Sequence, residues 1–256
     1  MMLALTREVS PAMAACELTH LARVPIDPLV AARQHLQYEQ ALARLGCRVE
    51  HVAPAPTLPD SVFIEDTAVV VDELAVLARP GADSRRPEVD GVAEVLRRYR
   101  PLAAITAPGR LDGGDVLRIG RVVYVGQSGR TNEEGISQLR AHLAPFGYEV
   151  RGVRPTGCLH LKTGVTAVSD RAVLLNPEWI PPSVFGGIEV ITVDPGEPFG
   201  ANVVRVGAAV LTGSEFPRTR RALEERGIEV HVVDVSELAK AEGAVTCCSI
   251  LLEVER

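Results

Sequence analysis

One type of segment recurs five times along this chain and restricts the fold to an architecture built from repeats. Each copy is a short apolar strand after a helical stretch, and four of the five begin with glycine, which is favoured just after a helix ends. The copies cover residues 46–52, 101–106, 147–153, 187–193 and 227–233, the second of them led by proline. Units of about 51 residues cannot bury their own apolar faces, so they must pack on one another.

A hairpin-like pair of apolar strands follows each copy, and a helix follows most of these pairs. We expect helices near residues 88–99, 132–145 and 217–226, whereas the fourth unit continues into a proline-rich stretch. No glycine-rich linker or block of charge divides the chain. The sequence therefore predicts an α/β fold in which a closed ring of about five units forms one domain over residues 1–256. A doubly wound sheet is the structural alternative, but neither a GxGxxG nor a Walker-A nucleotide motif supports it.

Composition excludes several classes of function. The chain carries a formal net charge of −6, whereas nucleic-acid binders concentrate Lys and Arg on one face. No apolar run reaches the ~18 residues of a membrane-spanning helix, and residues 1–8 do not read as a secretory signal. The five cysteines are odd in number and form no CxxC pair, which disfavours a disulfide framework or a zinc site. We therefore expect a cytoplasmic protein with reduced thiols that binds neither nucleic acid nor membranes.

A polar or reactive residue stands where the first hairpin strand of each unit begins. These residues are Asp66, Asp112, His160, Asn202 and Cys247, with successive spacings of 46, 48, 42 and 45 residues. In a closed ring, equivalent strand starts meet at one end of the axis, so we expect these side chains to converge. A thiol, a histidine and carboxylates together can perform nucleophilic catalysis, and two carboxylates fit a bound guanidinium.

Each of these residues also has an ordinary structural interpretation. A histidine or cysteine in an apolar strand is commonly a core residue, and aspartate beside glycine commonly caps a turn. Arg85 and Arg130 closely follow serine at expected helix starts, where a basic residue opposes the helix dipole unless an anion is near. A substrate carboxylate would supply that anion. The joint arrangement, rather than any single residue, favours a catalytic site.

The ordered motifs resemble the dimethylarginine dimethylaminohydrolase family of the guanidino-modifying superfamily. The motifs are LPDSVFIED (58–66), RPGADSRR (79–86), LDGGDVL (111–117), RTN (130–132), LHLK (159–162), AN (201–202) and TCCS (246–249). The resemblance runs from near residue 16 to residue 250 and implies a five-fold pseudosymmetric α/β propeller of the pentein type. It also implies a small-molecule substrate and no cofactor or metal ion.

The same resemblance assigns roles to individual residues. Cys247 corresponds to the nucleophile, His160 to the acid and then the base, and Asp112 to a residue that holds the guanidinium and orients the site. Cys247 is preferred to Cys248 because it follows threonine, and because strand alternation would point Cys248 to the opposite face. Residues 14–24 correspond to a mobile lid. The implied substrate-binding residues are Leu18 (through its backbone), Asp60, Glu65, Asp66, Arg85, Arg130 and Ala241 (through its carbonyl).

The implied reaction is that of a dimethylargininase. It converts asymmetric dimethylarginine or monomethylarginine to citrulline plus dimethylamine or methylamine through a covalent cysteine-linked intermediate. One alternative is an arginine deiminase or another guanidino-modifying enzyme, but deiminases generally carry a helical insertion for which these units leave no room. A second alternative is a catalytically inert propeller that acts as a binding protein, against which the intact set of polar residues argues. A homodimer is compatible with the sequence.

Overall fold

A computed structural model describes residues 1–255, in which the strands form five separate sheets of three. In every sheet the middle strand runs antiparallel to one neighbour and parallel to the other. The sheets are β15 (Ile250–Glu253), β1 (Met2–Thr6) and β2 (Arg48–His51); β3 (Ala68–Val70), β4 (Ala75–Leu77) and β5 (Leu102–Ala104); β6 (Val116–Ile119), β7 (Val122–Gly126) and β8 (Glu149–Val153); β9 (Val165–Ala167), β10 (Ala172–Leu175) and β11 (Glu189–Thr192); β12 (Val204–Val206), β13 (Ala209–Gly213) and β14 (Glu229–Val233). The repeat predicted from the sequence is therefore confirmed.

The recurring glycine-led segment is the third, parallel strand of each sheet. Gly46, Gly147, Gly187 and Gly227 precede β2, β8, β11 and β14 with φ between 75° and 90°. Only glycine adopts this left-handed conformation without steric cost, so it lets the chain leave a helix and turn directly into the strand.

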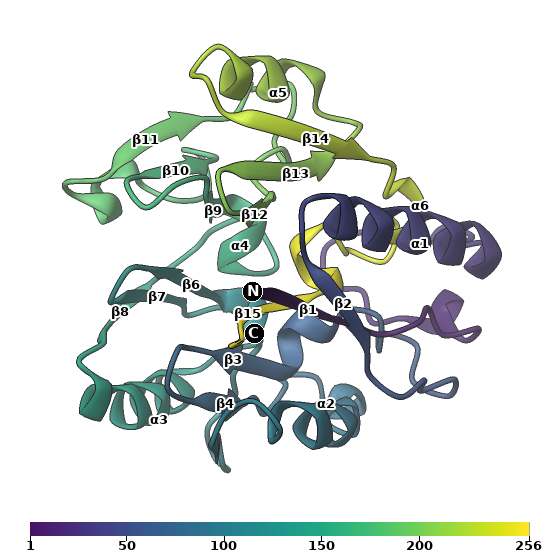
Figure 1. The fold of residues 1–256 in the computed structure, drawn as a ribbon, viewed down its shortest axis with the longest axis vertical. Helices are drawn as coiled ribbons and strands as arrows, with labels where there is room; N and C mark the ends of the chain where they lie inside the picture. The colour runs from purple at the N-terminus through teal and green to yellow at the C-terminus, as the bar shows by residue number, and fades with distance from the viewer. Residues whose placement is uncertain (256) are drawn as a thin grey trace.

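Helices connect the parallel strands and cover the outside of the molecule, where Figure 1 shows α1, α2, α3 and α5. The expected helices are present, although each ends a few residues earlier than predicted. The proline-rich stretch of the fourth unit forms only a 3-10 turn, η6. The bounds are α1 (Pro28–Arg44), α2 (Glu88–Leu96), α3 (Glu133–Leu143), α4 (Leu161–Gly164), α5 (Pro217–Glu224), α6 (Ser236–Ala239), η1 (Met13–Ala15), η2 (Ile64–Thr67), η3 (Asp83–Arg85), η4 (Gly113–Asp115), η5 (Ala144–Phe146), η6 (Pro182–Phe185) and η7 (Thr246–Cys248).

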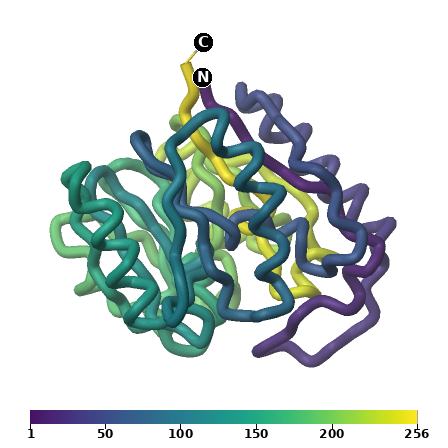
Figure 2. The backbone as a smooth tube through the Cα atoms, turned by 90° about the horizontal axis from the view of Figure 1, so that it is seen from below, coloured from purple at the N-terminus to yellow at the C-terminus, as the bar shows by residue number. Residues whose placement is uncertain are grey.

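The two ends of the chain complete one sheet together. β15 pairs antiparallel with β1, so the first sheet takes its first strand from the C-terminal end of the chain. The Met1 ammonium also donates to the Val254 carbonyl at 2.9 Å, and Figure 2 shows the two termini side by side. The first strands of all five sheets, β15, β3, β6, β9 and β12, line a central cavity of about 530 Å³.

The apolar core is divided among the contacts between neighbouring units, as the size of the units requires. One cluster, for example, joins Val69 and Val76 of the β3–β4 hairpin to Val123 and Ile136 of the following unit. Another joins Tyr38 and Leu42 of α1 to Leu211 of β13. Among residues 1–255, none of the helices has both the length and the hydrophobicity needed to cross a bilayer.

Candidate active site

Short turns, rather than the strands themselves, carry the polar residues found at the strand starts. Asp66 lies in η2 and Cys247 in η7, while Asp112 and His160 directly precede η4 and α4. Each of these turns leads into the first strand of its sheet, so the expected convergence occurs. Asp66, His160 and Cys247 line one pocket, and Asp112 bonds to His160 there.

The two adjacent cysteines have different surroundings, but not for the reason expected from the sequence. The expected strand alternation is wrong, because both residues lie in the 3-10 turn η7 and β15 begins only at Ile250. The half-buried Cys247 lines the pocket, and its Sγ accepts the Ala244 N–H at 3.4 Å. Cys248 is fully buried, and its thiol donates to the Ala244 carbonyl at 3.5 Å. Of the two thiols, only that of Cys247 faces the pocket.

Asn202, the fourth residue of the aligned set, supports the turn that carries Cys247. Its amide nitrogen donates to the Thr246 hydroxyl at 3.0 Å and to the Lys162 carbonyl at 2.9 Å. Its amide oxygen accepts the Thr246 N–H at 3.0 Å. Asn202 therefore joins η7 to α4, the elements that position Cys247 and His160.

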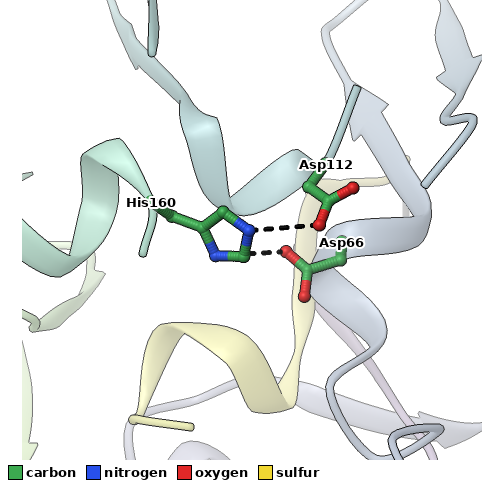
Figure 3. A group of neighbouring side chains, drawn as sticks. All are labelled: Asp66, Asp112 and His160. Carbon is green, nitrogen blue, oxygen red and sulfur yellow. Dashed lines mark hydrogen bonds and ion pairs between the residues drawn. The ribbon is translucent and has the colours of Figure 1, made fainter. Parts of the chain in front are cut away.

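The imidazole of His160 faces two carboxylates that precede different sheets, and Figure 3 shows both on the same side of the ring. Its Nε2 is 3.1 Å from Asp112 Oδ2, and its Nδ1 is 3.9 Å from Asp66 Oδ1. Asp112 also accepts the Gly81 N–H at 2.8 Å, and Asp66 accepts the Gly114 N–H at 2.9 Å. These bonds hold both carboxylates while they orient the ring.

The charges of this cluster change the proton affinities of its members. Burial alone would lower the pKa of His160, but Asp66, Asp112 and Asp115 outweigh it and raise this pKa to about 9. Burial alone would raise the pKa of Asp66, but His160 and Arg85 lower it to about 2. At neutral pH the site therefore holds an imidazolium beside an ionised Asp66.

Cys247 is protonated in this environment. Burial raises its pKa to about 12, and the carboxylates of Glu65 and Asp66 act in the same direction. A thiolate is the reactive form, so Cys247 needs positive charge beyond that of His160, Arg85 and Arg130, which already line the pocket, before it can act as a nucleophile.

The glycines of the LDGGD motif permit the close approach of these groups. A Cβ at Gly114 would lie 2.6 Å from His160 Nδ1 and 2.7 Å from Asp66 Oδ1. A Cβ at Gly113 would lie 2.0 Å from the Glu65 carbonyl oxygen. Both glycines are therefore required for η4 to pack against η2.

Asp115, the second aspartate of the motif, is a supporting residue to which the sequence analysis gave no role. Its carboxylate accepts the Leu161 N–H at 2.9 Å and the Ser128 hydroxyl at 2.6 Å, and it is fully buried. Burial raises its pKa to about 6. Asp115 thus fixes the start of α4 directly after His160.

Arg85 already has anions, contrary to the argument that a substrate must supply one. Its guanidinium is buried, lies 2.6 Å from Asp66 Oδ2 and 2.8 Å from Glu88 Oε2, and donates to the Phe63 carbonyl at 3.0 Å. The sequence did not identify Glu88 as a partner, although its position three residues after Arg85 allows the pairing. Arg85 nevertheless lines the pocket.

Other residues from the sequence analysis line the same pocket or lie beside it. Asp60 and Ala241 line it and are buried, and burial raises the pKa of Asp60. Arg130 also lines it, with Nη1 3.8 Å from Asp112 Oδ2 and Nη2 donating to the Thr19 hydroxyl at 3.0 Å. Leu18 is half-buried and packs against the core next to Glu17, a further lining residue.

Glu65, although a candidate substrate-binding residue, faces the central cavity and not the pocket of Cys247. Its Oε1 accepts a hydrogen bond from Lys162 Nζ at 2.6 Å, and both residues line the central cavity rather than the pocket of Cys247. The Glu65–Lys162 ion pair joins η2 to α4. The negative charge of the Glu65 carboxylate raises the pKa of Cys247.

The pocket itself is nearly closed. Its volume is about 20 Å³, whereas small-molecule sites commonly enclose several hundred Å³. Glu17 and Glu242 lie among its lining residues, and the sequence analysis missed both. Entry of a substrate therefore requires movement of the segment above the pocket.

The His160 cluster also has the spacing of a metal site. One ligand atom from each of Asp66, Asp112 and His160 lies within 4.8 Å of the others. Both imidazole nitrogens face carboxylates, and the raised pKa keeps the ring protonated at neutral pH. A metal ion would have to displace that proton, so it would compete with the acid–base role of His160.

The chain matches curated proteins and a solved structure over most of its length, although no protein-family model matches it. It is 41% identical over 252 residues to the N(G),N(G)-dimethylarginine dimethylaminohydrolase of Streptomyces coelicolor, covering 97% of this chain and 96% of that protein. It is 35% identical to the Pseudomonas aeruginosa protein of the same name, covering 88% of this chain and 89% of that protein. A solved Pseudomonas aeruginosa structure, a cysteine-to-serine variant complexed with citrulline, has a TM-score of 0.93 at 32% identity and covers 97% of this chain and 98% of that one.

Proposed function

Because the chain belongs to the dimethylarginine dimethylaminohydrolase family, we propose that it hydrolyses N-omega-methylated arginine to citrulline and dimethylamine or methylamine. The observation that carries the proposal is the meeting of Cys247, His160 and two aspartates at one pocket. These groups provide a nucleophile, a proton carrier and an anion for a cationic guanidinium, and Arg130 also lines the pocket.

The reaction begins when the guanidinium binds in the pocket beside Asp66. Asp112 is buried behind the imidazole and stays on His160 Nε2, so the structure does not support the expected direct contact of Asp112 with the guanidinium. Its positive charge near Cys247 opposes the effect of the carboxylates and lowers the pKa of the thiol from about 12. The thiol then loses its proton to solvent, because His160 is already protonated, and the thiolate forms. The sulfur then forms a bond to the guanidino carbon and gives a tetrahedral adduct.

His160 moves the protons of the two half-reactions. In the first, the imidazolium gives its proton to the methylated nitrogen, the C–N bond breaks, and the amine leaves. In the second, the neutral imidazole takes a proton from water, whose oxygen bonds to the carbon of the S-linked thiouronium. The C–S bond then breaks while the hydroxyl proton of the adduct passes to the departing sulfur, which releases citrulline and restores the Cys247 thiol. Asp112 orients the ring throughout through its 3.1 Å contact with Nε2.

The amino-acid end of the substrate lies toward Arg130. We propose that Arg130 and Arg85 bind the α-carboxylate, with Arg130 the freer of the two because Asp66 and Glu88 already pair with Arg85. Asp60, the Leu18 backbone and the Ala241 carbonyl would hold the α-amino group and the chain. Glu65 would act on the site from the side of the central cavity, through its negative charge and its ion pair with Lys162.

Cysteine variants test the assignment of the nucleophile. Cys247→Ser should lower citrulline release from dimethylarginine by at least about a thousandfold, because a serine hydroxyl does not ionise in this pocket. Cys248→Ser is the matched control and should retain activity within about threefold, since its thiol does not face the pocket. Full activity without Cys247 would refute the mechanism.

Substrate choice separates this function from its alternatives. Methylated arginines should give citrulline and the amine, whereas efficient ammonia release from arginine alone would favour a deiminase. Binding of a methylated arginine with no turnover at all would favour the inert propeller.

We further propose that residues 1–256 act as one catalytic domain in the cytoplasm and that the chain can form a homodimer. Five free cysteines fit a reducing compartment. Exposed Leu29 and Leu36 on α1 offer apolar surface to a second copy. Cell fractionation tests the cytoplasmic location, and light scattering tests the homodimer.

A further inference from the structure

The segment above the pocket is held mainly by polar contacts. Residues 17–25 are all exposed or half-buried, and they lie between buried Cys16 and buried Ile26. The Glu17 N–H donates to Asp60 at 3.1 Å, and Lys240 donates to the Pro25 carbonyl at 3.3 Å. A segment with so little buried apolar surface opens at low free-energy cost once its polar contacts break.

Glu242 supplies the densest group of these contacts. Its carboxylate accepts hydrogen bonds from three consecutive backbone N–H groups, those of Thr19, His20 and Leu21. The Thr19 N–H is 3.0 Å from each carboxylate oxygen, and the Leu21 N–H is 2.6 Å from one of them. Consecutive N–H groups that converge on one anion form a nest, and bonds to an ionised acceptor are stronger than neutral ones. Glu242 itself lines the pocket, directly after Ala241.

The backbone of Glu242 adopts a strained, left-handed conformation. Its φ is 58°, and it is the one non-glycine residue within residues 1–255 with a positive φ. Glycine is the usual residue in this conformation, and a longer side chain occupies it only where the surrounding structure enforces it. This backbone conformation brings the carboxylate to the N–H groups of residues 19–21. We infer that glutamate stands here because of these side-chain contacts, since the turn by itself would favour glycine.

We propose that Glu242 is a positioning residue, the latch that holds residues 17–25 over the pocket and so sets substrate affinity. The proposal rests on the proposed function, because the closed segment would place Leu18 at the amino-acid end of the substrate, next to the Glu17 N–H that donates to Asp60. Closure also keeps Thr19 on Arg130, so the latch acts on the carboxylate-binding arginine as well. The carboxylate must release the segment to admit a substrate, because the volume of about 20 Å³ holds no arginine derivative. It raises affinity by holding the segment again once the substrate is bound.

Two substitutions separate the latch from the stability of the fold. Glu242→Gln keeps the size of the side chain but removes its charge, whereas Glu242→Gly removes the carboxylate and relieves the φ strain. Glu224→Gln is the matched control, because Glu224 is an exposed glutamate on α5 with one ion pair to Arg220. Residue-resolved amide exchange in the ligand-free protein, steady-state kinetics and thermal unfolding are measured for all three.

We expect exchange at Thr19, His20 and Leu21 to accelerate at least about tenfold in both Glu242 variants. KM for dimethylarginine should rise about tenfold while kcat changes less than about threefold, because the residues that perform the chemistry are untouched. The glycine variant should unfold at the wild-type temperature or above it, and the Glu224→Gln control should match wild type throughout. Unchanged exchange in Glu242→Gly, or faster exchange with an unchanged KM, would overturn the latch. A wild-type protein inactive on methylated arginines would refute the proposed function instead, and amide exchange would still decide whether Glu242 holds the segment.

Discussion

His160 keeps its proton at neutral pH because three aspartates surround it, although burial alone would favour the neutral ring. In the proposed mechanism this proton goes to the departing amine, so the charges that hold it in the folded protein would also serve the reaction. The same arrangement keeps Asp66 ionised and Cys247 protonated in the ligand-free pocket.

The pH dependence of stability tests this charge arrangement. A histidine whose pKa is about 9 in the folded state and about 6.5 unfolded stabilises the fold fully below about pH 6.5, and this contribution disappears as pH rises through 9. Between about pH 6 and pH 10, wild type should lose about 3 kcal/mol more unfolding free energy than His160→Gln, as measured by urea titration. Parallel stability curves for the two proteins would contradict the raised pKa.

Among the structural elements, the short turns that lead into the first strand of each sheet determine the site. η4 and η2 approach so closely that glycine is required at positions 113 and 114, and Asn202 joins η7 to α4. Each turn thus places its polar residue against a turn from another sheet, which no single sheet could do.

A single added methyl group tests this packing. Gly114→Ala should lower kcat/KM at least about a hundredfold, because the new Cβ would displace the imidazole or Asp66 from the geometry needed for proton transfer. Gly129→Ala is the matched control, since a Cβ there meets nothing within 4 Å and activity should stay within about twofold. If both variants kept full activity, the close approach of η4 would be irrelevant to catalysis.

For the whole molecule, β1 and β15 from the two ends of the chain pair in one sheet. We therefore expect the fold to need this strand pair, but not to need the chain to begin and end at these positions. The neighbouring units bury each other's apolar faces, and the termini lie side by side. The molecule should therefore tolerate new ends wherever the backbone is exposed and carries no site residue.

A circular permutant tests this expectation. Joining residues 255 and 1 through a short glycine–serine linker and opening the chain between Gly120 and Arg121, an exposed hairpin tip, should leave activity within about tenfold. Opening the chain between Gly113 and Gly114 should abolish activity, because that cut releases η4 from η2. Unfolding of the first permutant would show that strand order, and not only ring closure, is required.

The sequence by itself determined the five-fold repeat, the sheets' third strands and the set of strand-start residues, because hydrophobic period and glycine positions are local signals. The order of the motifs also predicted Cys247 and His160 as catalytic residues, and both line one pocket. Only the tertiary structure decided that Arg85 pairs with Glu88 and Asp66, that Glu65 faces the central cavity, and that Glu242 holds residues 19–21. Those facts depend on contacts between turns of different sheets, and local sequence patterns carry no information on which distant carboxylate will meet which cation or backbone N–H group.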